Sequence, residues 1–210
     1  MTRNRVIAIA VVVALGLFAG CATTMMSDAD VAKQALVVMK SSFKENGQAK
    51  LDRLDQDEVQ ATCSRYETPD KIPKDVAQRL EESQLKTVKY PADGQLLGDW
   101  RAGEAIAQSG VGKQFNDDPS RPSGANCYAC HQLTPQELAF GTIGPSLLGF
   151  GKLRGNSEEI RKYAYAKVYN SQAFSACSTM PRFGHNGILT EQQMKDVVAL
   201  LLDPASPVNK

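Results

Sequence analysis

The sequence has almost no net charge and no apolar stretch long enough to cross a membrane. Its 24 lysine and arginine residues are balanced by 23 aspartate and glutamate residues, which gives no electrostatic reason to expect nucleic acid or an anionic membrane surface as a partner. The apolar run at residues 6–18 is too short to span a bilayer. Internal repeats and low-complexity tracts are also absent from the sequence. What remains is a chain of 210 residues, 42% hydrophobic, with the size and composition of one or two folded globular domains.

The N-terminus has the pattern of an export signal. Arg3 and Arg5 precede the apolar run, which ends in small residues. Cys21 follows, and the segment LFAGC at residues 17–21 resembles the lipobox of bacterial lipoproteins, in which the cysteine is acylated and becomes the new N-terminus. The alternative is ordinary signal cleavage nearby. Both interpretations predict a mature protein in the periplasm, and the first anchors it to a membrane through lipid on Cys21.

Each of the five cysteines can be assigned a role. In an oxidising compartment a free thiol tends to form a bond with a partner. Cys21 would carry the lipid, and Cys127 and Cys130 form a C-x-x-C pair. This leaves Cys63 and Cys177, which we predict to form a disulfide. The alternatives for this last pair are two buried, unreactive thiols, or Cys177 as a metal ligand.

Apolar periodicity predicts a mostly α-helical chain. The expected helices cover residues 28–46, 49–68, 74–85, 99–109 and 190–202. The charged run at residues 52–58 is interpreted as a solvated face of the second helix, and residues 90–94 contain a turn with Pro91 and Gly94. We therefore divide the chain into a signal peptide at residues 1–21, a helical N-terminal extension at residues 22–92, and a C-terminal domain at residues 93–210.

The strongest signal is the segment CYACH at residues 127–131, which matches C-x-x-C-H, the attachment sequence of c-type haem. The thiols of Cys127 and Cys130 lie one helical turn apart and can add to two vinyl groups on one side of the porphyrin, while His131 presents its imidazole to the iron. One alternative is a thioredoxin-like dithiol, which does not need the histidine and usually lies in a βαβ pattern that is absent here. The other is half of a zinc site, for which the further ligands would be Cys63, Cys177 or His185.

A haem-binding histidine usually has its second ring nitrogen oriented by donating Nδ1–H to a carbonyl. In class I c-type cytochromes a proline carbonyl accepts this bond, and Pro145 follows His131 at a suitable distance. The alternative for Pro145 is an ordinary turn. The haem motif and this proline resemble those of class I c-type cytochromes. The resemblance implies a class I cytochrome c-like domain at residues 93–210 with one covalent haem c. The apolar residues expected to line the haem are Leu133, Leu138, Phe140, Leu147 and Leu148.

The second axial ligand of the iron must come from elsewhere in the chain. Met180 lies in a loop just before the last predicted helix, and Pro181 stiffens the backbone beside it. A thioether ligand raises the reduction potential and suits electron transfer. We expect Met180 in this position. His185, Cys177 and an open site are the alternatives.

Several segments together resemble SoxX, the cytochrome subunit of the SoxAX complex of thiosulfate-oxidising bacteria. The resemblance extends over about residues 94–207 and narrows the family beyond what the haem motif alone allows. Its segments, in order, are GDWRAGE at residues 98–104, NCYACH at 126–131, GTIGPSL at 141–147, MPRFG at 180–184 and the closing helix.

This resemblance implies a role in sulfur oxidation. SoxAX joins thiosulfate oxidatively to a cysteine of the carrier SoxY, as a heterodimeric L-cysteine S-thiosulfotransferase. The sulfur chemistry takes place at the SoxA haem, and the SoxX-like subunit passes electrons to a soluble cytochrome c. Two rival functions stay open: a free-standing monohaem electron carrier without a SoxA partner, and a ligand-binding or sensory haem protein.

Overall fold

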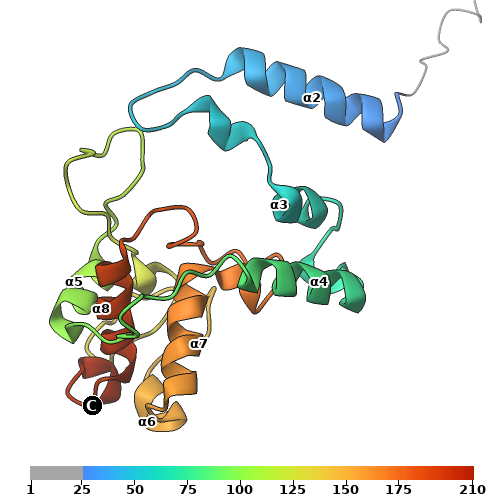
Figure 1. Ribbon diagram of the computed structural model, residues 1–210. Helices are drawn as coiled ribbons and strands as arrows, with labels where there is room; N and C mark the ends of the chain where they lie inside the picture. The colour runs from blue at the N-terminus through green and yellow to red at the C-terminus, as the bar shows by residue number, and fades with distance from the viewer. Residues whose placement is uncertain (1–25) are drawn as a thin grey trace, which may run out of the picture. The chain divides into compact units, whose positions relative to one another are not determined.

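The computed structural model describes residues 26–210, so the predicted signal peptide and Cys21 lie outside the described residues. These residues form seven α-helices and, apart from one isolated bridge between Asn46 and Ala49, no β-structure. The prediction of a mostly α-helical fold is therefore confirmed. Within residues 26–210, none of the helices has the length and apolar character needed to cross a membrane. The described residues divide into two units, which meet between Phe43 and Lys44, and each is described by itself (Figure 1).

The first unit contains helix α2 (Asp28–Ser42). The Ser27 side chain accepts a hydrogen bond from the Asp30 amide and so caps the first turn. The helix ends earlier than the predicted residue 46, because the backbone of Phe43 is extended. None of its residues is buried.

The prediction of one helix over residues 49–68 is wrong. The structure has a short 3₁₀ turn, η1 (Leu51–Leu54), and then a separate helix, α3 (Glu58–Cys63). The Asp57 carboxylate accepts from the Gln60 amide, and the Gln60 side chain accepts from the Asp57 amide. This reciprocal capping box starts a new helix at Glu58. Asp57 therefore marks a helix start inside the charged run that the sequence suggested was one continuous face.

The other three helices predicted in the second unit are present within one residue of their predicted bounds. After the 3₁₀ turn η2 (Pro69–Lys71), helix α4 has the predicted bounds, Lys74–Leu85. Helices α5 (Trp100–Gln108) and α8 (Glu191–Leu202) follow their N-caps Asp99 and Thr190. Two helices were not predicted, α6 (Phe150–Arg154) and α7 (Glu158–Tyr169). Short 3₁₀ turns complete the unit: η3 (Cys127–Ala129), η4 (Ser171–Ala173) and η5 (Pro207–Asn209).

Helix α8 is the centre of the second unit. Figure 1 shows α5 and α7 beside it, and its residues from Met194 to Leu202 are all buried. The backbones of α5 and α8 come very close at Gly103, where a Cβ atom would overlap the carbonyl group of Asp196. The Asp99 amide also donates to the Asp196 carboxylate. The main core cluster joins these helices through buried residues that include Tyr165, Val168, Tyr169, Val197, Val198 and Leu201.

The predicted boundary between residues 92 and 93 falls inside the second compact unit. The compact unit that contains the C-x-x-C-H segment begins at Lys44. Residues 44–92 belong to it because Val59 of α3 and Leu80 of α4 share a hydrophobic cluster with Ala176, close in sequence to Met180. Most of the predicted extension is therefore part of the same folded body.

We expect Gly103→Ala to destabilise the second unit, because the added methyl group must push α5 away from α8. Overpacking of this kind typically costs about 1–3 kcal/mol. Urea unfolding followed by far-UV circular dichroism measures this change. Gly110→Ala is the matched control, since a Cβ there would meet nothing closer than 3.6 Å. Equal stability of the two variants would contradict the close approach at Gly103.

Candidate haem-attachment site

The C-x-x-C-H segment forms a tight turn between α5 and α6. Cys127 begins η3, and the amides of Cys130 and His131 both donate to the Cys127 carbonyl, at 3.1 and 2.9 Å. This turn puts the two thiols and the imidazole on adjacent positions of one short segment. Neither Cys127 nor Cys130 is in a disulfide, so both thiols are available for thioether bonds.

The imidazole of His131 is held from one side by the backbone of residues 144 and 145. Its Nδ1 lies 2.7 Å from the Pro145 carbonyl oxygen. Because a carbonyl can only accept, Nδ1 carries the proton in this bond and the Nε2 lone pair is left for a metal. A Cβ at Gly144 would overlap the His131 ring. The structure therefore brings Pro145 to the position that the sequence analysis gave it, and explains the glycine before it.

The rest of this segment supplies apolar surface. Leu133 is buried, and Phe140, Leu147 and Leu148 are half-buried. Leu138 was expected to line the haem, but 89% of its surface is exposed. Ile143, which the sequence analysis did not single out, is 77% exposed. Two thiols, an oriented imidazole and flanking aliphatic side chains fit a covalently bound porphyrin.

The two alternatives for the C-x-x-C pair find no support in residues 26–210. No group of three or more histidine, cysteine, aspartate or glutamate side chains in this range could hold a metal ion, as a zinc site would require. The described residues also lack the strands of a βαβ unit. Burial raises the pKa of the Cys127 thiol to about 12, whereas redox-active dithiols have a lowered pKa.

The segment that carries Met180 follows α7 and η4. The Ser171 hydroxyl donates to the Met180 carbonyl at 2.6 Å, and the Met180 amide donates to the Ser178 hydroxyl at 3.2 Å. The Met180 side chain is half-buried against the main core cluster. His185, the first alternative ligand, is exposed, with its amide bonded to the Tyr169 carbonyl.

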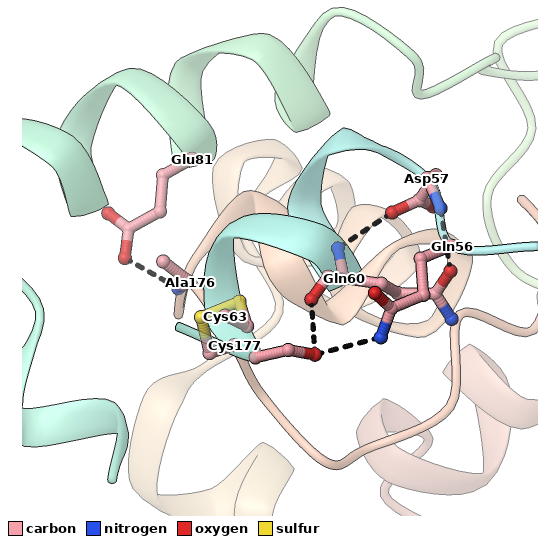
Figure 2. Close-up of a disulfide and its surroundings, with 8 residues drawn as sticks. Gln56, Asp57, Gln60, Cys63, Glu81, Ala176 and Cys177 are labelled. Carbon is pink, nitrogen blue, oxygen red and sulfur yellow. Dashed lines mark hydrogen bonds between the residues drawn. A yellow bond between two sulfur atoms is a disulfide. The ribbon is translucent and has the colours of Figure 1, made fainter. Parts of the chain in front are cut away.

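Cys63 and Cys177 form a disulfide, the pairing that the sequence analysis predicts. Figure 2 shows the bridge between α3 and the segment before Met180. The two Cα atoms are 5.5 Å apart, and the sequence separation of the cysteines is 114. Beside it, the Glu81 carboxylate accepts a hydrogen bond from the Ala176 amide at 2.9 Å. Because its sulfur is bonded, Cys177 offers no thiolate to a metal.

One residue of this segment was missed by sequence reasoning. The Arg182 side chain is only 7% exposed, and its Nη2 lies 2.6 Å from Asp57 Oδ2. Nothing local in the sequence announces this contact, because its partner comes from the capping box of α3. The available sequence signal was Asp57 itself, because aspartate is a preferred residue at the start of a helix.

Comparisons with known proteins agree with this geometry. A family model described as cytochrome c matches residues 112–203, which include the whole C-x-x-C-H segment and Met180. The chain contains a domain of the cytochrome c family. It is also similar to a protein of Aquifex aeolicus named "Uncharacterized lipoprotein", with 42% identity over 160 residues that cover 74% of this chain and 73% of that protein.

The cytochrome c domain implies covalently bound haem c, and Cys127, Cys130 and His131 are the residues that would hold it. The relative's name fits the lipobox at Cys21, which lies outside the described residues.

We predict that Cys127→Ser or Cys130→Ser abolishes normal two-thioether attachment of the haem in this cytochrome. In the unchanged protein, haem should stay with the polypeptide when the denatured chain is extracted with acidified organic solvent. The double variant Cys63→Ser, Cys177→Ser is the control, because these cysteines lie outside the motif. Release of all haem from the unchanged protein would refute the assignment.

Proposed function

We propose that this cytochrome is the monohaem electron-transfer subunit of a SoxAX-type complex. The observation that carries the proposal is an oriented His131 together with a Met180 segment that is fixed by its own hydrogen bonds. The SoxX-like segments at residues 98–104, 141–147 and 180–184 support the narrower identity. Under this proposal His131 and Met180 are the axial ligands of one haem iron, and the haem supplies one-electron chemistry.

The partners follow from the chemistry of the complex. Coupling thiosulfate to a cysteine thiol of a SoxY-type carrier forms an S–S bond and releases two electrons and the thiol proton. This chain offers no thiol for that step within residues 26–210, because Cys63 and Cys177 are bonded and Cys127 and Cys130 belong to the haem motif. We therefore assign the sulfur chemistry to a SoxA-like haem subunit. This chain receives the electrons one at a time and passes them to a soluble cytochrome c acceptor.

The proposed location is the periplasm, with an anchor to a membrane through lipid on Cys21. The lipobox at residues 17–21 and the lipoprotein name of the Aquifex aeolicus relative support this location. A tethered electron carrier would act on partners that diffuse to it.

We expect the ferric protein to show the weak near-infrared charge-transfer band of methionine sulfur on haem iron. Met180→Ala should abolish this band and lower the reduction potential, because the thioether favours the ferrous state. His185→Ala is the matched control and should leave the band unchanged. If the band survives Met180→Ala, or if His185→Ala alters the low-spin spectrum, the second axial ligand of the iron is a residue other than Met180.

The complex is tested by purification of the tagged full-length chain from cells of its source organism grown on thiosulfate. We expect a second haem-containing subunit to co-purify in about equal amount, and mass spectrometry identifies it. The same preparation from cells grown without a reduced sulfur source is the comparison. A chain that elutes as a haem-loaded monomer under both conditions would indicate a free-standing electron carrier instead.

A further inference from the structure

Arg182 is a buried cation two positions after Met180, and Asp57 is the anion that balances it. Its Nη2 contacts the Asp57 carboxylate at 2.6 Å, while its buried Nη1 has no hydrogen-bond partner within residues 26–210. We propose that the Asp57–Arg182 ion pair is a positioning device that keeps Met180 on the haem iron. This inference rests on the proposed ligation by Met180, and it assigns a role to two residues that do not themselves touch the iron.

Asp57 is well suited to be a fixed point. As the N-cap of α3, its carboxylate accepts the Gln60 amide at 2.8 Å, and the helix that it caps has Val59 buried in a hydrophobic cluster. Partial burial opposes ionisation, but the Gln60 hydrogen bond and the Arg182 charge together hold the pKa of Asp57 below its ordinary value. The carboxylate is therefore an anion that α3 holds in place (Figure 2).

The ion pair and the disulfide hold the Met180 segment on both sides. Cys177, three positions before Met180, is bonded to Cys63 at the end of α3, and Arg182 is paired with Asp57 at its start. The disulfide alone would restrain only the chain before the methionine. With both links, Met180 lies on a short segment whose two ends are tied to one helix.

This arrangement matters because an axial methionine leaves the iron by local opening of its loop, and not by unfolding of the whole protein. Opening on the C-terminal side of Met180 requires Arg182 to separate from Asp57, or to carry an unpaired charge in a buried position, which is costly. The ion pair therefore raises the free energy of the open state. Its loss should speed the opening without changing the rest of the fold.

Asp57→Asn tests this role with little disturbance of α3, because asparagine caps a helix about as well as aspartate does. The matched control is Asp75→Asn, which removes the carboxylate of an exposed pair with Arg79 at 2.8 Å on α4. The measurement is the rate at which imidazole displaces Met180 from the ferric full-length holoprotein, followed by loss of the near-infrared band. We expect Asp57→Asn to raise this rate about tenfold or more, and Asp75→Asn to leave it unchanged.

Two further readouts separate positioning from general stability. On heating, the near-infrared band of Asp57→Asn should disappear well below the temperature at which far-UV circular dichroism reports unfolding. The imidazole displacement rate of Arg182→Lys should be closer to the wild-type rate than that of Arg182→Gln. Equal rates for Asp57→Asn and Asp75→Asn, or loss of the band only together with helical signal, would overturn the positioning role alone. Absence of the band from the wild-type protein would instead overturn the proposed Met180 ligation, and this inference with it.

Discussion

The hydrogen bond between His131 Nδ1 and the Pro145 carbonyl is the constraint on which the haem site depends. It fixes the tautomer of the imidazole and leaves Nε2 as its metal-binding atom. The bond exists because residues 141–147 fold back over the C-x-x-C-H turn, where the amides of Gly144 and Leu147 donate to the carbonyls of Cys130 and Gln132. The residues that would attach the haem and the contacts that orient His131 thus lie in one short stretch of chain.

The Met180 segment is built in the opposite way, from contacts between distant parts of the sequence. The Asn170 amide group donates to side chains of Gln84 and Thr87, and Cys63 and Asp57 supply the disulfide and the ion pair. Residues 57–87 are therefore not an accessory placed before a finished cytochrome domain. They support the segment that carries its second candidate ligand, and they lie in the same compact unit, which begins at Lys44.

This contrast explains how much of the protein could be predicted from sequence. The contact of Pro145 with His131, the Cys63–Cys177 disulfide and helix α4 were predicted from local spacing or from the cysteine count, and the structure contains all three. The break before α3 and the burial of Arg182 depend on one residue, Asp57, whose cap and ion pair are invisible to a periodicity argument. Charges in a run are usually solvated, so only the tertiary contact could show that this one is not.

A site that transfers electrons gains from ligands that the protein, and not the iron, keeps in place. His131 is fixed by a backbone carbonyl and by the tight approach of Gly144. The backbone of Met180 is fixed by Ser171 and Ser178, whose hydrogen bonds do not involve the iron. Neither set of contacts depends on the charge of the metal, so oxidation and reduction need not rearrange them. With both proposed ligands held in this way, the protein contacts would be the same in the ferric and ferrous states. This property would suit electron transfer better than reversible binding of a ligand at the iron.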